Sequence, residues 1–287
     1  MIIEQILKNK FKRTVFNGIH YTLDEEQKRV YLAKEYHQKL LSKEPGDFGA
    51  FKKIGGSTAG KVLETDIFNN QFQAFCHISR LSLPMLDSKY VDAGVALEPK
   101  IINKLATEAH VDIQTFDVKK YNYDFFKGKN KYIGGIPDGY IESKNMIIEI
   151  KTVGEKKKDA WEASGPNLSY IKQAQLYSYL IGADFWGIFA IFLREEDYQK
   201  PENLDVNTRF SYKFIQKLDK KQAKDDLDKI EQWFKEYSES GISPQYNPVV
   251  DSDLIAYLKC QNEEQWLQLL MKWYEEKKVV LYEKDLL

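Results

Sequence analysis

From residue 132 to residue 153 the chain reads Tyr-Ile-Gly-Gly-Ile-Pro-Asp-Gly-Tyr-Ile-Glu-Ser-Lys-Asn-Met-Ile-Ile-Glu-Ile-Lys-Thr-Val. Two short runs with apolar residues flank a polar turn at residues 143–145, and this pattern predicts two strands joined by that turn. The second strand would cover residues 146–153. The sequence on either side of this pair is dominated by stretches that favour helices.

In the second strand, successive side chains point to opposite faces because a strand repeats every two residues. Ile148 and Ile150 therefore share one face, and Glu149 and Lys151 share the other. The apolar face can pack into a core. The opposite face then presents a carboxylate beside an amine.

Asp138 lies at the first strand, and a hairpin can bring it back to the end that carries Glu149 and Lys151. An Asp, a Glu and a Lys that converge on one patch can hold a divalent metal ion and control a nucleophilic water. The alternative is an ordinary surface pair of Glu149 and Lys151 on an edge strand, since Glu-x-Lys alone is a common tripeptide. The acidic residue upstream, at this spacing, favours the metal site.

Composition leaves the partner open. The chain has 287 residues, of which 43% are hydrophobic and 30% are charged, and its net charge is −1. This length allows one large domain or two small ones, with a substantial core. Because there is no global positive charge, binding to nucleic acid would need basic residues concentrated in one groove.

The two cysteines, Cys76 and Cys260, lie far apart in the sequence. They exclude a disulfide framework and any site with four cysteine ligands, whether zinc or iron–sulfur. The four histidines are not spaced for a structural zinc site. The chain has no apolar run of 18 residues and no signal-peptide pattern, which predicts a cytoplasmic protein without a membrane segment.

The order of elements predicts a mixed α/β fold, with a central β-sheet flanked by helices. We expect one domain over residues 1–287, with a helical N-terminal extension at 1–45, a core at 50–215 and a helical C-terminal extension at 219–287. A capping box at residues 22–25 predicts a helix that runs to about residue 42. The other predicted helices are 66–90, 92–105, 169–181, 219–240, 251–259 and 262–276; the other predicted strands are 111–123, 183–193 and 210–215.

The segment 55–61 has nearly the glycine and lysine spacing of a phosphate-binding loop. A nucleotide-hydrolysing site is disfavoured, because Val62 stands where a magnesium-binding Ser or Thr is needed and no buried strand precedes the loop. We favour a turn at residues 55–56 and a helix capped by Ser57 or Thr58. The free amides of that helix start could hold a phosphate, or the helix could be an ordinary capped one.

Gly-Ile-Pro-Asp138-Gly followed by Ile-Ile-Glu149-Ile-Lys151 resembles the PD-(D/E)XK nuclease signature. More narrowly, the chain resembles the YqaJ-like viral recombinase family, which includes lambda exonuclease. Three further motifs carry this resemblance: Gly94-x3-Glu98-Pro99, Gln173-x-Gln175 in a helix after the second strand, and Ile54-Gly-Gly-Ser57. The order and spacing of the four motifs, over roughly residues 50–195, make the resemblance specific.

The resemblance implies a restriction-endonuclease-like core and a magnesium site, with manganese as a substitute ion. Asp138, Glu149 and the Ile150 carbonyl would bind the metal, and Glu98 would complete the site. Lys151 would position the attacking water.

Two further roles follow from the same resemblance. Gln173 would support the water that Lys151 positions. Ser57, together with Lys52 or Lys53, would hold the terminal phosphate of the DNA.

The implied activity is magnesium-dependent hydrolysis of phosphodiester bonds from the ends of linear duplex DNA, in the 5′→3′ direction, for phage-type recombination or repair. The implied partners are duplex DNA ends, a single-strand annealing protein and, by analogy with the family's ring-shaped trimer, further copies of the chain. The alternatives are a restriction-type endonuclease and a catalytically inactive DNA-binding or scaffold protein of the same fold.

Overall fold

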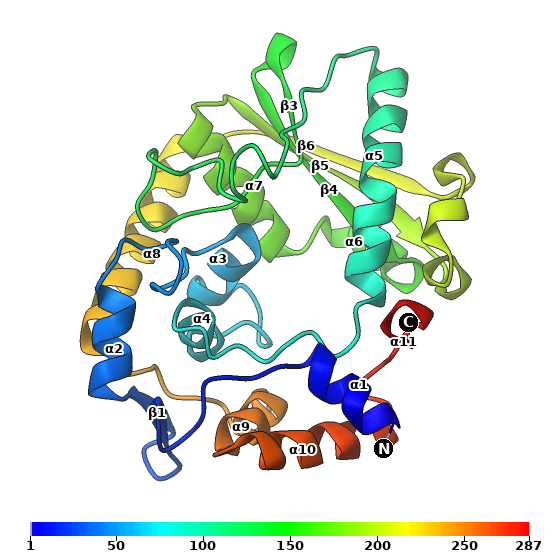
Figure 1. Cartoon of the computed structure of the whole chain (residues 1–287). Coiled ribbons are helices and arrows are strands. Elements are labelled where there is room, and N and C mark those ends of the chain that lie inside the picture. Colours follow the sequence, from blue (N-terminus) through cyan, green and yellow to red (C-terminus); the bar gives the residue numbers. More distant parts are fainter. Residues whose placement is uncertain (1, 287) are drawn as a thin grey trace. The chain divides into compact units, whose positions relative to one another are not determined.

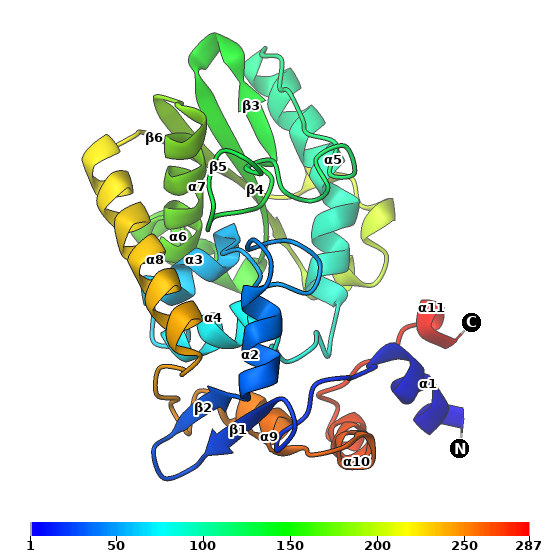
Figure 2. The ribbon, with the colours of Figure 1, turned by 60° about the vertical axis from the view of Figure 1, so that its left-hand side comes forward.

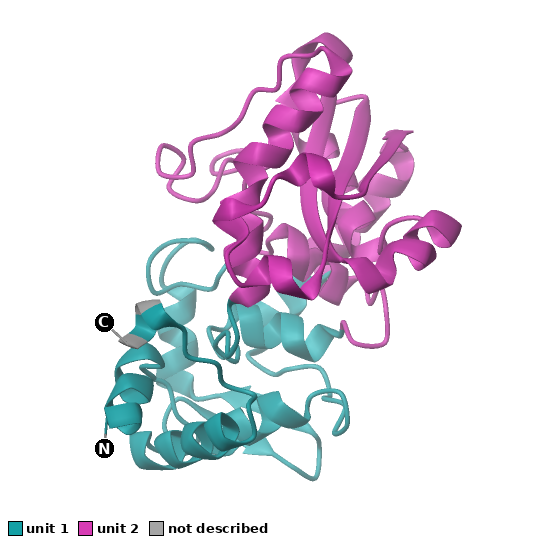
Figure 3. Cartoon of the chain, turned by 90° about the vertical axis from the view of Figure 1, so that its right-hand side faces the viewer, with its two compact units in different colours: residues 1–52, 70–88, 233–287 teal, residues 53–69, 89–232 magenta. Residues whose placement is uncertain are grey.

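A computed structural model describes residues 2–286. The chain divides into two compact units, which are coloured separately in Figure 3. The first comprises Met1–Lys52, Asn70–Ser88 and Trp233–Leu287, and the second comprises Lys53–Asn69 and Lys89–Gln232. Three of the four recognised motifs lie wholly in the second unit between residues 89 and 232, and Ile54 and Ser57 lie in its other segment.

The second unit contains a four-stranded sheet (Figure 1). Its strand order is β3-β4-β5-β6. β3 and β4 are antiparallel, β4 and β5 are parallel, and β5 and β6 are antiparallel. The predicted mixed sheet is therefore confirmed. The strands are β3 (Gly139–Ile141), β4 (Met146–Gly154), β5 (Phe185–Leu193) and β6 (Ser211–Lys217).

The predicted hairpin forms as β3 and β4. A short 3₁₀ turn, η1 (Glu142–Lys144), joins them and ends at Asn145, whose backbone is left-handed with a φ of 46°; Asn tolerates this conformation better than most residues. β3 pairs only with residues 146–148 of the longer β4. The edge of β4 beyond Ile148 therefore has no partner from β3.

Helices cover both faces of this sheet. Ile148 and Ile150 pack with α5 (Lys89–Ala109) in one buried cluster. Val153 lies in the other cluster, with residues of α6 (Lys158–Ser164) and α7 (Leu168–Ile181). Figure 2 shows α5 and α7 on opposite sides of the strands. The predicted separation of faces along β4 is confirmed.

Helix α3 (Gly56–Val62) packs closely on α7, and its glycines permit that approach. A Cβ added at Gly60 would lie 2.8 Å from the Cβ of Ser169, a distance that two carbon atoms cannot adopt without a shift. The helix begins after Gly55 and has no side-chain cap, so the predicted cap by Ser57 or Thr58 is wrong.

The first unit is built from helices and one small hairpin. Its core includes Phe72, Phe75, Trp266 and Leu270. Its elements are α1 (Ile2–Lys10), β1 (Tyr21–Asp24), β2 (Arg29–Leu32), α2 (Lys34–Leu41), α4 (Gln71–Ile78), α9 (Ser252–Lys259), α10 (Glu263–Glu275) and α11 (Glu283–Leu286); α8 (Lys220–Ser240) contributes residues to both units.

The helix predicted from residue 22 to about residue 42 is wrong. β1 and β2 form a hairpin there, and helix α2 begins only at Lys34. The side chain of Asp24 accepts hydrogen bonds from the amides of Glu26 and Gln27 at 2.9 and 2.8 Å. Such a turn competes with helix formation for the same backbone groups.

Two other predictions, a strand at residues 111–123 and a helix at 66–90, differ from the structure. The predicted strand at 111–123 is absent; within it only Gln114 bridges to Tyr140, and residues 118–123 form turns. The helix expected over 66–90 shortens to α4. The helices and strands predicted after residue 168 all form within a few residues of the expected bounds. No helix within residues 2–286 has the length and apolar character that crossing a membrane requires.

We predict that Ile148→Ala lowers the free energy of unfolding by about 2–5 kcal/mol, because it leaves a cavity between β4 and α5. Ile215→Ala on β6 is the matched control, since Ile215 is 51% exposed, and it should change stability by less than about 0.5 kcal/mol. Thermal or urea unfolding measures both. Equal effects of the two substitutions would contradict the packing described for β4.

Candidate active site

Glu149 is fully buried, with no exposed side-chain surface. Its Oε2 accepts a hydrogen bond from Lys151 Nζ at 2.9 Å, whereas its Oε1 is buried without a hydrogen-bond partner among the described residues. Burial raises the pKa of Glu149 to about 8, against the lowering influence of Lys151; the charges of Asp138 and Glu98 raise it further. A buried carboxylate with one unsatisfied oxygen is costly and marks a place where a ligand could bind.

Asp138 takes the place of the missing strand partner of β4. Its Oδ2 accepts a hydrogen bond from the backbone amide of Ile150 at 2.6 Å. The same oxygen lies 3.8 Å from Lys151 Nζ. Because β3 stops pairing at Ile148, the carboxylate reaches the next free amide of the edge.

Lys151 stands between the two carboxylates. Its Nζ also lies 5.4 Å from the centre of the Tyr170 ring. Burial disfavours the ammonium form, but Glu149 and Asp138 outweigh burial and raise the pKa of Lys151 above its usual value. The amine therefore stays charged and can donate hydrogen bonds.

Glu98 reaches the same site from α5. Burial raises the pKa of Glu98 to about 7, the charge of Asp138 raises it further and Lys151 lowers it. Asp138 and Lys151 both act on Glu98, so the three groups share one electrostatic environment. Glu98 belongs to the helix on the Ile150 face of the sheet, and Glu149 projects from the other face. The two can approach each other only at the open edge of β4.

The donor set fits a hard divalent cation, although it is not a preformed cage. In the part of the chain that the structure describes, residues 2–286, no three His, Cys, Asp or Glu side chains are arranged to hold a metal ion. Lys151 Nζ bonds to Glu149, and Asp138 bonds to the Ile150 amide. Glu149 Oε1 remains a buried oxygen without a partner, and carboxylate oxygens are the ligands that magnesium prefers.

Tyr177 is a residue of the site that the sequence motifs did not identify. Its hydroxyl accepts a hydrogen bond from the amide of Gly56 at 3.1 Å and donates one to the carbonyl of Gly134 at 3.3 Å. Tyr177 thus joins the start of α3 to the segment that precedes Asp138. Burial raises the pKa of Tyr177, and the negative charge of Glu149 adds to that rise. The sequence could have indicated Tyr177, because it lies four residues after Gln173 and therefore on the same face of the helix.

Position 135 requires a glycine because the Tyr177 side chain leaves no room for a Cβ there. Its φ is +123°, and a Cβ at this position would lie 2.0 Å from the Tyr177 hydroxyl oxygen. Both facts exclude a side chain three residues before Asp138. The glycine at position 135 of the motif therefore has a steric reason in this chain.

Gln173 packs against the start of α3. A Cβ added at Gly56 would lie 2.4 to 2.7 Å from atoms of the Gln173 side chain. Gln173 therefore lies beside the helix that carries Ser57, which is exposed. Its predicted support of the Lys151 water stays a prediction.

The two lysines predicted to hold a phosphate differ in their surroundings. Lys53 Nζ forms an ion pair with Asp124 at 2.8 Å and donates to the carbonyl of Asn130 at 2.7 Å. It therefore anchors the loop before the active-site hairpin. Lys52 belongs to the first unit, where burial and the neighbouring Arg80 lower its pKa.

Comparison with known proteins gives relatives in sequence. The chain is 28% identical to the uncharacterized protein MG373 of Mycoplasma genitalium, over 71% of this chain and 86% of that protein. It is 25% identical to the MG373 homolog of Mycoplasma pneumoniae, over 76% of this chain and 89% of that protein. No family model matches the chain.

The solved structures that resemble this chain include exonucleases. They include the alkaline exonuclease LHK-Exo of Laribacter hongkongensis, with 14% identity and a TM-score of 0.47 over 78% of this chain and 95% of that one. They also include a phage-related exonuclease of Haemophilus somnus 129PT, with 14% identity and a TM-score of 0.49 over 66% of this chain and 94% of that one.

We predict that Gly135→Ala lowers the melting temperature, because it adds a steric clash with Tyr177 to the strain of a left-handed backbone. The clash should cost about 1–3 kcal/mol, as overpacking does. Gly182→Ala is the matched control: φ is +82° there and a Cβ would meet nothing within 4 Å. Tyr177→Phe in the Gly135→Ala background should recover part of the loss. Similar melting temperatures for the two alanine variants would refute this account.

Proposed function

We propose that this chain is a metal-dependent deoxyribonuclease that removes nucleotides from the ends of linear duplex DNA. The observation that carries the proposal is the buried Glu149, with one unsatisfied oxygen, held beside Lys151 and Asp138 at the open edge of β4. An interior carboxylate and amine in this arrangement suit a charged substrate and a hard cation better than a structural role. The four ordered sequence motifs support the same activity.

Asp138 and Glu149 would hold magnesium, or manganese in its place, with the Ile150 carbonyl and Glu98 as further ligands. When bound, such an ion polarises a phosphoryl oxygen and lowers the pKa of a coordinated water. Glu149 Oε1 offers the buried oxygen that has no other partner.

Lys151 supplies the positive charge that the chain itself brings to the reaction. Its Nζ is held 2.9 Å from Glu149 and 3.8 Å from Asp138, so its position is set by both carboxylates. From there the ammonium group can orient a water or stabilise the charge that develops on the phosphate.

A cavity of about 530 Å³ lies at the ends of the parallel strands β4 and β5. Thr152 follows Lys151 directly and lines this cavity, as do Tyr170 and Trp161. The buried indole nitrogen of Trp161 has no hydrogen-bond partner among residues 2–286. The cavity has room for one nucleotide. Tyr170, whose ring centre lies 5.4 Å from Lys151 Nζ, connects it to the candidate catalytic groups.

The polarity of digestion follows from the candidate phosphate contact. Ser57 is exposed on α3, which Tyr177 and Gln173 hold against α7. If Ser57 grips a terminal 5′-phosphate, hydrolysis proceeds 5′→3′ and leaves a single strand. Such a strand is the substrate for an annealing protein in recombination or repair, and a ring of chain copies would keep the enzyme on it.

We predict that Lys151→Ala lowers the rate of degradation of linear duplex DNA by about 10²–10⁴-fold, since it removes the ammonium group that would orient the water or stabilise the charge on the phosphate. Lys221→Ala is the control, because the Lys221 side chain is 87% exposed and forms an ion pair with its helix neighbour Asp225. Circular dichroism should show that both variants are folded. Chelation with EDTA should abolish activity, and added magnesium or manganese should restore it. Full activity of Lys151→Ala would refute the proposal.

We predict that closed circular DNA resists the protein while linear DNA with 5′-phosphates is degraded. Gel analysis of circular, linear and dephosphorylated linear substrates separates the candidates. Cleavage of closed circles would favour a restriction-type endonuclease. No cleavage of any substrate, together with no magnesium or manganese binding by calorimetry, would favour a DNA-binding protein without catalysis.

A further inference from the structure

A second cavity lies in the same unit as the candidate active site. Its lining differs from that of the cavity at the ends of β4 and β5. Its volume is about 620 Å³, and it lies along the irregular segment 114–129 that precedes the active-site hairpin. This volume is enough for one nucleotide. The side chains that matter for its chemistry are Phe116, Tyr121, Phe125, Lys120, Lys127 and Lys129.

Three aromatic rings that contact one another line this cavity. The centres of the Phe116 and Phe125 rings are 4.6 Å apart, and those of Tyr121 and Phe125 are 5.0 Å apart. The rings contact one another at tilted and edge-on angles. Such a cluster presents π surfaces at low entropic cost, because aromatic side chains have few rotatable bonds.

Positive charge is concentrated here although the whole chain carries −1. Residues 117–131 contain five lysines and two aspartates, a net charge of +3, and all five lysines are exposed. One of the aspartates, Asp124, is already engaged by Lys53 at 2.8 Å. The Nζ of Lys129 lies 3.8 Å from the centre of the Phe125 ring. Cations and rings are therefore interleaved, as nucleic-acid sites require.

The segment is tied to the active site at several points. Gln114 exchanges two backbone hydrogen bonds with Tyr140, at 2.8 and 2.9 Å. The amide of Phe125 donates to the carbonyl of Gly135 at 2.9 Å. These anchors lie on either side of Asp138 in the sequence. The ring of Phe126 adds a contact with Tyr177, at 5.0 Å between centres.

The tip of the segment holds an unusual backbone. Asn122 and Tyr123 have φ values of 48° and 62°, a conformation that a bulky aromatic residue rarely adopts. Tyr123 is nevertheless 70% exposed. No core packing explains a strained and exposed tyrosine, and such strain persists most often where it serves binding.

We propose that residues 114–129, which we call the basic–aromatic segment, bind single-stranded DNA, with Phe116 and Tyr121 stacking on an unpaired base and Lys120 and Lys129 contacting its phosphates. Bases inside a duplex are already stacked on both faces, so these rings can stack only on a base of a strand that has been separated. The inference rests on the proposed nuclease function in naming DNA as the ligand. The ligand of this site would be the strand that the nuclease does not digest and that remains single-stranded.

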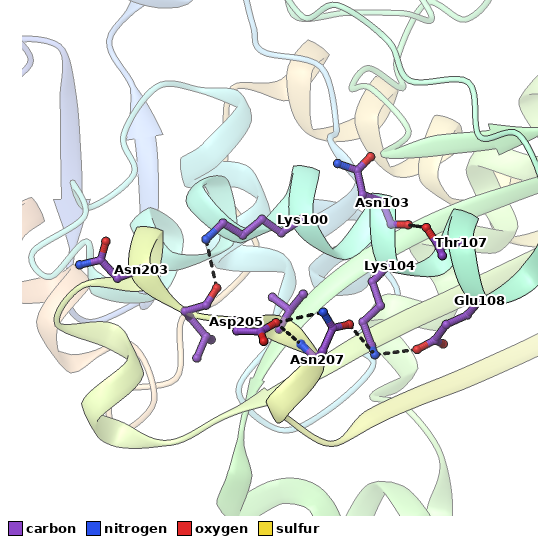
Figure 4. A pocket seen from close by; sticks show the side chains of 10 residues that line it. Lys100, Asn103, Lys104, Thr107, Glu108, Asn203, Asp205 and Asn207 are labelled. Carbon is purple, nitrogen blue, oxygen red and sulfur yellow. Dashed lines mark hydrogen bonds and ion pairs between the residues drawn. The ribbon is translucent and has the colours of Figure 1, made fainter.

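Another cavity of similar volume, about 600 Å³, shows why the lining matters (Figure 4). It lies between α5 and residues 203–207. Its amines are engaged within the protein: Lys104 Nζ bonds to Glu108 at 2.6 Å and to Asn207 Oδ1 at 3.2 Å, and Lys100 Nζ bonds to the Leu204 carbonyl at 3.0 Å. Among the described residues, those that line it include no aromatic side chain. It lacks the stacking surface that the basic–aromatic segment provides.

The first experiment measures binding of fluorescein-labelled dT15 by anisotropy in EDTA, so that no hydrolysis occurs. Tyr121→Ala and Phe116→Ala should each weaken binding by about 5- to 150-fold, the effect of losing one stacked base. Tyr121→Phe should bind as the unchanged protein does, because the ring is kept. Phe210→Ala is the control, as Phe210 is an aromatic residue outside this cavity that is 36% exposed.

The second experiment varies the salt concentration. Lys120→Gln combined with Lys129→Gln should reduce the slope of log K against log salt by about 1.4, the value for two phosphate contacts on a single strand. Lys221→Gln combined with Lys224→Gln on α8 removes two exposed lysines elsewhere in the same unit and should leave the slope unchanged.

Unchanged binding of dT15 by folded alanine variants would overturn the inference. The inference would also be overturned if the alanine variants lost as much affinity for a blunt 15-base-pair duplex as for dT15. The site would then not select unpaired bases. Nuclease assays on the same proteins separate the two proposals. Weakened dT15 binding in a protein without nuclease activity would refute only the proposed function. An active nuclease whose variants bind normally would refute only the binding site.

Discussion

The structure of the candidate site depends on the cost of burying the carboxylate of Glu149. A charged carboxylate in the interior is stable only when a cation or several hydrogen bonds offset its lost hydration. Lys151 provides that cation at 2.9 Å, on the same face of β4. The pair satisfies only one of the two oxygens, because Glu149 Oε1 has no partner within residues 2–286. Glu149 Oε1 is therefore the buried oxygen that the proposed metal ion would bind.

The short length of β3 makes this position accessible. A longer β3 would bond the amide of Ile150 and cover the edge of β4; instead, the side chain of Asp138 accepts from that amide. Groups from both faces of the sheet can then meet, which explains how Glu98 on α5 joins residues that belong to the opposite side. Tyr177 holds the preceding glycines in place from α7. The site is thus assembled from four segments around one unpaired strand edge.

The same edge relates the two proposals. The active-site hairpin is flanked in the sequence by the basic–aromatic segment, which is bonded to Tyr140 and Gly135 on either side of Asp138. A strand leaving the candidate catalytic groups would therefore meet lysines and rings without crossing to another unit of the chain. The whole chain carries a net charge of −1, so the proposed binding of a polyanion would use the positive charge that is concentrated in this segment.

The sequence alone determined the elements whose signals are local. The alternation along residues 146–153, the apolar run of β5 and the periodic stripe of α10 each follow from the burial of one face or both, and all three form. The spacing of Asp138, Glu149 and Lys151 likewise predicted their convergence. The local signals gave a wrong prediction at Asp24, where the same residues can start a helix or form a turn. The side chain of Asp24 bonds to the backbone of that turn, and a hairpin forms in place of the predicted helix. Tertiary structure alone decided the contacts between distant residues: the ion pair of Lys53 with Asp124, the hydrogen bonds of Tyr177 and the unsatisfied oxygen of Glu149. These contacts depend on which polar groups become buried together when the chain packs. The periodicity of the sequence carries no information about that.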